Sequence, residues 1–166
     1  GIPWRVAFAL QDVGWYLRQD IIWSKPNPMP ESVKDRCTKS HEYLFLLTKK
    51  PKYFYDSDAI KEAATYHRHV GKIGDNRGAR TDKRRGTGAN SMSGGHSEYR
   101  NKRSVWTVNT RPYGEAHFAV YPPELIEPCI LAGSAKGDLV LDPFGGSGTT
   151  AAVALKHGRR AIVCEL

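Results

Sequence analysis

The chain has 166 residues, 40% of them hydrophobic, which is enough for a packed core and excludes a wholly disordered protein. No stretch approaches the roughly 18 apolar residues of a transmembrane helix, and the first residues lack the pattern of a signal peptide. The three cysteines are far apart and lack the spacing of metal ligands, which favours free thiols in a reducing cytoplasm.

The formal net charge of +8 is concentrated in one part of the sequence. Between Lys61 and Arg103, eleven basic residues stand against four acidic ones, and they account for nearly all of the excess. A positive segment of this kind suits a polyanion such as nucleic acid. Charge alone leaves open a solvated loop that binds nothing.

The first third of the chain has the pattern of ordered structure. Residues 6–10 can continue a helix that stops at Gly14. Residues 15–23 (WYLRQDIIW) predict a strand, because aromatic and β-branched residues dominate. Three prolines hold residues 25–30 (KPNPMP) extended. The continuous apolar run at 43–47 (YLFLL) predicts a buried strand.

The middle of the chain differs in texture from its two ends. Residues 59–104 hold seven of the sixteen glycines and almost no large aliphatic residues. Such a segment cannot bury enough apolar surface to order itself, so we expect a flexible excursion that becomes ordered on a partner.

The last third predicts a strand–helix–strand unit. A short strand is expected at 105–108, and a helix begins at Pro122 and Pro123 and ends near Gly133. Further along, buried strands are expected at 138–142 and 160–166, with a helix over 149–157 between them. Strand, glycine-rich turn, helix and strand make a βαβ unit with a right-handed crossover.

The glycine turn of this unit predicts a ligand site. The sequence Gly146-Ser147-Gly148 follows a strand end and precedes a helix, so bare backbone amides face outward. Glu165 ends the next strand, about twenty residues on, where such folds place an acid that accepts hydrogen bonds from ribose. No Gly-Lys-Ser/Thr follows, so S-adenosylmethionine, an adenosine without phosphates, fits better than a nucleotide. A tight packing turn is the alternative.

Three segments carry a family resemblance. Residues 141–150 (LDPFGGSGTT) resemble motif I of the DNA amino-methyltransferases, the group that methylates adenine N6 or cytosine N4. Residues 117–130 (HFAVYPPELIEPCI) resemble motif X, and residues 20–56 resemble the block after the catalytic motif in the β class. The basic segment lies where this family places target recognition.

The resemblance implies a fold and a division of the chain. The fold is an α/β, Rossmann-like S-adenosylmethionine-dependent methyltransferase core with a mostly parallel sheet, incomplete at both ends and with a basic, loop-rich insert. Residues 1–58 would be the post-catalytic part of the core, residues 59–104 the flexible recognition insert, and residues 105–166 the cofactor-binding part.

The resemblance also implies site residues. Those expected to bind the cofactor are His117, Phe118, Pro122, Asp142, Pro143, Phe144, Gly145, Gly146, Ser147, Gly148, Thr149, Thr150 and Glu165. Those expected to contact DNA are Lys25, Asn27, Arg36, His41, Arg80, Lys83, Arg84 and Arg85. Three alternatives stay open: Phe144 as simple core, His117 as a structural residue, and Arg36 with His41 as ties of the proline loop.

No catalytic residue is assigned within the chain. The family uses Asp, Asn or Ser followed by Pro-Pro and an aromatic residue to orient the target amine. The only Pro-Pro here lies in YPPE, residues 121–124, within the motif X segment. We expect the catalytic motif upstream of Gly1 in a longer protein, and we expect the isolated chain to be inactive. Methyl transfer of this kind requires no metal.

The resemblance implies a site-specific DNA methyltransferase of a bacterial or phage cytoplasm, acting in restriction–modification or a related role. Its cofactor would be S-adenosylmethionine, and its partner double-stranded DNA with a flipped target base, with no membrane involved. The alternative is a non-catalytic nucleic-acid-binding module that retains the fold, motivated by the missing tetrapeptide. Methylation of RNA or of a small molecule is a third possibility.

Overall fold

The structure is a computed structural model that describes residues 1–64, 98–111 and 120–165. The chain forms two compact units, Gly1–Lys61 with Asn101–Leu166, and Glu62–Arg100. In the second unit, the antiparallel strands β3 (Glu62–Ala63) and β4 (Tyr99–Arg100) are described. Across them, Arg100 Nε lies 2.9 Å from Glu62 Oε1. None of the helices in the described ranges is long and apolar enough to cross a bilayer.

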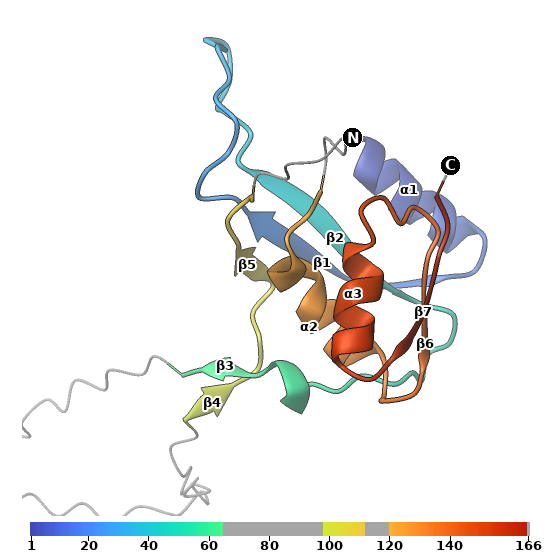
Figure 1. Ribbon diagram of the computed structural model, residues 1–166. Coiled ribbons are helices and arrows are strands. Elements are labelled where there is room, and N and C mark those ends of the chain that lie inside the picture. The colour runs from blue at the N-terminus through green and yellow to red at the C-terminus, as the bar shows by residue number, and fades with distance from the viewer. Residues whose placement is uncertain (65–97, 112–119, 166) are drawn as a thin grey trace, which may run out of the picture. The chain divides into compact units, whose positions relative to one another are not determined.

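The first half of the larger unit is a helix followed by a mixed three-stranded sheet. Helix α1 (Ile2–Asp12) precedes β1 (Tyr16–Ser24), which pairs antiparallel with β2 (His41–Thr48) and parallel with β5 (Val105–Thr107). The sheet order is β2-β1-β5, so β1 is the central strand (Figure 1). This arrangement places the carboxyl ends of β1 and β5 at one edge of the sheet.

The second half of this unit is the predicted βαβ arrangement. The 3-10 helix η1 (Asp58–Ile60) contacts α2 (Pro123–Gly133), and β6 (Leu139–Asp142), α3 (Thr149–Lys156) and β7 (Arg160–Val163) follow. Strands β6 and β7 are parallel and in register. Figure 1 shows α2 and α3 side by side, with α3 beside the two strands.

The structure supplies the start of the first helix. Residues 6–10 were predicted to continue a helix that stops at Gly14, and α1 begins at Ile2. Pro3 sits in the first turn, where its fixed φ suits a helix and its missing N–H costs nothing. Gly14 then adopts φ +94° and ends the helical path, as expected.

The predicted burial of three strands was wrong. The strand expected at 43–47 is β2, in which only Thr48 is fully buried and the apolar residues are half-buried. In β6, Leu139 and Leu141 are 51% and 62% exposed. In the last strand, which ends at Val163 rather than at 166, Ile162 and Val163 are also exposed.

One-sided packing explains the exposure in β6 and that of Ile162 in β7. Successive side chains of a strand point to opposite faces, so a single covering helix buries only alternate residues. Val140 and Ala161 pack against the cluster of Ile130, Val153 and Ala154, which comes from α2 and α3. The other faces of β6 and β7 lack such a layer within the described part of the chain. A mostly parallel sheet was also expected, but the described pairs, two parallel and two antiparallel, make the fold mixed α/β.

A second apolar cluster joins the first sheet to α2. Ile21 and Trp23 of β1, Trp106 of β5 and Leu125 of α2 are buried together. Trp23 also donates its indole N–H to the Val108 carbonyl oxygen, at 2.8 Å. This cluster fixes the start of α2 against the carboxyl end of β1, and a pocket opens beside it.

Arg159 fills the space between the ends of two helices. Its guanidinium is buried and donates to the backbone oxygens of His157, at 2.7 Å, and Ser134, at 2.6 Å. Ser134 follows α2 and His157 follows α3, so both acceptors carry the partial negative charge of a helix C-terminus. Arg159 therefore holds α2 and α3 together at one end.

Candidate cofactor site

The glycine turn is anchored to both strands of the βαβ unit. The Gly145 amide donates to the Cys164 carbonyl oxygen at 2.8 Å, and the Cys164 amide donates to the Asp142 carbonyl oxygen at 2.9 Å. Gly146 and Gly148 adopt φ +50° and +76°, which a residue with a Cβ adopts only with strain. The turn thus leads from β6 into α3 by a path that only small residues follow easily.

Glu165 closes the open side of this turn. Its Oε2 accepts a hydrogen bond from the Gly146 amide at 2.5 Å, across nineteen positions of sequence. The sequence predicted a glycine turn after one strand and an acid at the end of the next, and the structure brings the two into direct contact. Both groups are exposed, so a ligand can reach them.

The Asp142 carboxylate sits in a hydrogen-bond network at the end of β6. Its Oδ1 accepts the Phe144 amide at 3.0 Å, and its Oδ2 accepts the Thr150 hydroxyl at 2.6 Å. The Tyr121 hydroxyl lies 3.0 Å from the same Oδ2. Burial alone would raise the pKa of Asp142, but these hydrogen bonds outweigh it and lower that pKa below its usual value. The side chain is therefore an anion at neutral pH.

Tyr121 is a member of the site that sequence reasoning missed. It lies in the motif X segment directly before Pro122, which is the N-cap of α2. In the sequence an aromatic residue beside two prolines is indistinguishable from a core residue. Its neighbours at the site, Asp142 and Thr150, are distant in sequence. The one available signal was that Tyr121 directly precedes Pro122, a predicted site residue.

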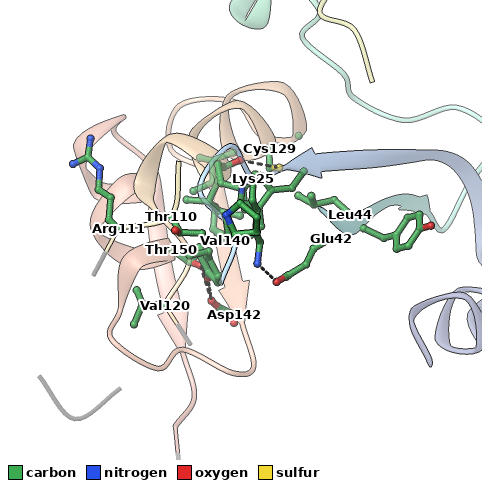
Figure 2. A pocket seen from close by; sticks show the side chains of 18 of the residues that line it. Lys25, Glu42, Leu44, Thr110, Arg111, Val120, Cys129, Val140, Asp142 and Thr150 are labelled. Carbon is green, nitrogen blue, oxygen red and sulfur yellow. Dashed lines mark hydrogen bonds and ion pairs between the residues drawn. The ribbon is translucent and has the colours of Figure 1, made fainter. Parts of the chain in front are cut away.

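A pocket of about 1310 Å³ opens beside this network. The residues that line it come from the segment after β1, from β2, from α2 and the segment before it, from β6 and from α3. Among them are Lys25, Glu42, Tyr121, Asp142 and Thr150. Figure 2 shows the Lys25–Glu42 pair and the Asp142–Thr150 hydrogen bond as dashed lines within this pocket. Asp142, expected to bind the cofactor, and Lys25, expected to contact DNA, thus line one pocket.

Lys25 and Asn27 already have partners in the chain. The Lys25 ammonium lies 4.3 Å from the centroid of the Trp23 ring and pairs with Glu42. The side-chain amide of Asn27 donates to the Thr110 carbonyl oxygen at 3.1 Å and accepts the Thr110 amide at 3.0 Å. Asn27 therefore ties the loop after β1 to the segment after β5, and its role toward DNA stays a prediction.

Arg36 lies on the loop that joins β1 to β2, and His41 is the first residue of β2. Arg36 is exposed, and its guanidinium lies 3.2 Å from Asp35 and 4.0 Å from Glu31. His41 Nε2 lies 3.4 Å from the Tyr43 hydroxyl. These contacts leave both readings of the two residues open, as ties of the loop or as contacts to DNA.

The remaining predicted residues lie either in the glycine turn and the start of α3 or outside the described ranges. Phe144 is 85% exposed, so the alternative in which it is simple core is wrong. Ser147 and Thr149 contact each other through their hydroxyls at 3.0 Å, at the start of α3, and Pro143 lies exposed in the turn. Six predicted residues lie outside the described ranges: His117, Phe118, Arg80, Lys83, Arg84 and Arg85.

The described residues contain no group of three or more His, Cys, Asp or Glu side chains that could hold a metal ion. Their three cysteines are unpaired. Cys37 and Cys164 are exposed, whereas burial raises the pKa of Cys129 to about 11. The thiolate is the reactive form of cysteine, so these three positions should differ in reactivity.

We expect a thiol-reactive disulfide reagent at about pH 8 to modify Cys37 and Cys164 in the native protein and to spare Cys129. Urea should then release the third thiol. Peptide mass mapping before and after denaturation measures this directly. Rapid native labelling of Cys129 would contradict its burial beside the pocket.

Comparison with known proteins finds related sequences and structures. The family model described as DNA methylase, of the N6/N4 type, matches residues 2–166. Type II methyltransferase M.Cfr9I of Citrobacter freundii is 51% identical over 166 residues, all of this chain and 45% of that protein. Type II methyltransferase M.SmaI of Serratia marcescens is 48% identical over all of this chain and 47% of its own length. The chain therefore spans about half the length of the curated relatives it matches.

Solved structures show the same fold. PvuII DNA methyltransferase, described as cytosine-N4-specific, superimposes with a TM-score of 0.69 at 20% identity, over 99% of this chain and 52% of that one. The complex of M1.HpyAVI with SAM gives a TM-score of 0.60 at 22% identity, over 97% of this chain and 61% of that one. With a family model that matches nearly its whole length, this chain belongs to the N6/N4 DNA methylase family.

Proposed function

We propose that the protein transfers a methyl group from S-adenosylmethionine to the exocyclic amine of adenine (N6) or cytosine (N4) in DNA. The observation that carries the proposal is the contact of Glu165 with the Gly146 amide at the ends of two parallel strands. An acid beside a bare glycine turn at such an edge suits the ribose of an adenosine. The match to the DNA methylase family supports the same reaction class.

The residues present fit this cofactor by charge. S-adenosylmethionine carries two positive groups, a sulfonium and an α-ammonium, and the pocket offers the Asp142 carboxylate in ionised form. When bound, the cofactor supplies a methyl group attached to a positively charged sulfur. After transfer of the methyl group, that sulfur is a neutral thioether. We assign Glu165 to the ribose and Asp142 to the amino-acid end.

The other cofactor contacts remain assignments by position in the motifs. The turn residues Pro143 to Thr149 line the path between these two ends, and Thr150 orients Asp142. We propose His117, Phe118 and Pro122 as the wall that faces them. The side chain that accepts the hydrogens of the target amine is not assigned to any residue of this chain.

For the DNA partner we propose two regions. Lys25 and Asn27 line the pocket, which a flipped base would enter, and His41 lines a smaller pocket that shares Lys25 with it. Arg36 lies on the exposed loop after β1 and would contact the DNA backbone. The insert at residues 59–104, with Arg80, Lys83, Arg84 and Arg85, would contact the phosphate backbone and read the target site. The names of the curated relatives support a role in restriction–modification.

Replacing Glu165 with alanine should weaken S-adenosylmethionine binding by about 1–3 kcal/mol, because charge-assisted hydrogen bonds to the ribose are lost. Isothermal titration calorimetry on the full-length protein measures the change in Kd. The matched control is Asp12→Ala, which removes an exposed acid at the end of α1 and should leave Kd unchanged. An equal Kd for Glu165→Ala and the unaltered protein would rule out the ribose role.

Transfer of labelled methyl groups separates the proposal from its alternative. The full-length protein should label duplex DNA on adenine or cytosine, in a sequence-dependent way. Binding of DNA and cofactor without any transfer would instead favour a nucleic-acid-binding module that retains the fold. Labelling of RNA but not of DNA would contradict the proposed substrate.

A further inference from the structure

Three segments of the chain meet in one hydrogen-bond network at the pocket wall. Tyr121 precedes α2, Asp142 ends β6, and Thr150 lies in the first turn of α3. The Tyr121 hydroxyl lies 2.5 Å from Thr150 Oγ1 and 3.0 Å from Asp142 Oδ2. All three side chains line the same pocket, in which Figure 2 labels Asp142 and Thr150.

The protons of this network have one consistent arrangement. Thr150 has a single hydroxyl proton, which it donates to Asp142 Oδ2 at 2.6 Å. Its oxygen therefore accepts from Tyr121, whose single proton points toward Thr150. Burial is the largest of the effects that raise the pKa of the Tyr121 phenol, so the phenol remains a donor at neutral pH.

The network also leaves one acceptor position of Asp142 open. Each carboxylate oxygen has two lone pairs. Oδ2 accepts the Thr150 hydroxyl and has the Tyr121 hydroxyl 3.0 Å away, whereas among the described residues Oδ1 accepts only the Phe144 amide. A ligand that donates an N–H bond can use the remaining lone pair of Oδ1. An α-ammonium has such protons, whereas a sulfonium has no N–H or O–H to donate.

We propose that Tyr121 is a positioning residue that holds the Asp142 carboxylate toward the α-ammonium of the cofactor. This inference rests on the proposed function and adds a residue to it. The next residue, Pro122, holds Tyr121 in place. Pro122 is the N-cap of α2, and the Pro122 carbonyl oxygen accepts a hydrogen bond from the Leu125 amide at 3.0 Å. The start of α2 is thereby coupled to the glycine turn through two hydroxyls.

The test compares two ligands in the full-length protein. Tyr121→Phe removes the hydroxyl and keeps the ring, so the fold should survive. We expect the Kd for S-adenosylmethionine to rise about 3- to 10-fold, the effect of one or two lost hydrogen bonds. The Kd for 5′-methylthioadenosine, which lacks the amino-acid end, should stay unchanged. Tyr16→Phe, at the exposed start of β1, is the matched control and should alter neither Kd.

The results distinguish a positioning role of Tyr121 from a purely structural one. Loss of affinity for S-adenosylmethionine alone supports the inference, and Thr150→Val should then produce the same selective loss without adding fully to Tyr121→Phe. Equal weakening of both ligands, or no change in either, overturns it while the proposed function stands. Failure of the unaltered protein to bind S-adenosylmethionine would overturn the proposed function and this inference with it.

Discussion

Replacing Arg159 with alanine is expected to lower the free energy of unfolding by about 3–5 kcal/mol, a large fraction of the stability of a domain of this size. The guanidinium is 7% exposed and donates to the backbone oxygens of Ser134 and His157. Its Nε also lies 3.3 Å from the Ser134 hydroxyl. Alanine would leave these acceptors without their donor and open a cavity between α2 and α3.

The chemistry of the guanidinium explains why no other residue replaces it well. Arg159 has no carboxylate partner among the described residues, so the carbonyl groups at two helix C-termini stabilise its charge. A lysine has one donor head and cannot span both acceptors with the fork of an arginine. We therefore expect Arg159→Lys to recover only part of the loss.

The neighbouring arginine is the matched control. Arg160 is exposed and makes one contact, 3.1 Å from its Nε to the Gly137 carbonyl oxygen. Arg160→Ala removes the same side chain one position away and should cost less than about 0.5 kcal/mol. Urea unfolding followed by far-ultraviolet circular dichroism measures both variants. Equal midpoints for Arg159→Ala and Arg160→Ala would show that the helix ends do not depend on the buried guanidinium.

Local signals in the sequence predicted the βαβ unit well. Glycines at 148 and 158 bracket α3, and their φ values of +76° and +73° are those that an L-residue adopts only with strain. Outside this unit, the strand predicted at 15–23 differs from β1 by one residue at each end. Such features depend on neighbours within a few positions, so a single sequence contains them.

Burial could not be predicted in the same way. An apolar run such as that of β6 shows that a strand is stable, but it does not show how many layers cover it. Leu139 and Leu141 are exposed because α2 and α3 pack on the other face, which holds Val140. Which faces are covered depends on elements distant in sequence.

Long-range contacts mark the same limit at the site. The meeting of Gly146 and Glu165 was predictable because strand–turn–helix–strand geometry brings the two together from a fixed spacing. The three hydrogen bonds between Asn27 and Thr110 span 83 positions and leave no pattern in the chain. Tyr121 was missed for the same reason, since its role depends on partners from two other segments.

Replacing Gly145 with alanine should disrupt the candidate cofactor site through a clash with the end of β7. A Cβ at this position would lie 2.8 Å from Val163 Cβ and 3.3 Å from the Cys164 carbonyl oxygen. The Cβ of Val163 is fixed to the β7 backbone, and the Cys164 oxygen is a backbone atom of the next residue. No rotamer change can move either atom, so the clash remains. The turn must move away from the strand, and the 2.8 Å bond from the Gly145 amide to Cys164 must lengthen.

That movement separates Glu165 from the turn it closes, since Gly146 is the next residue along. We therefore expect Gly145→Ala to raise the Kd for S-adenosylmethionine at least about tenfold and to lower stability by about 1–3 kcal/mol.

Gly133→Ala is the control for stability, because a Cβ there meets no atom within 4 Å. It should change stability by less than about 1 kcal/mol. Calorimetric titration and thermal unfolding of the two variants measure both quantities. If Gly145→Ala bound the cofactor like the unaltered protein, the close approach of turn and strand would not be what shapes the site.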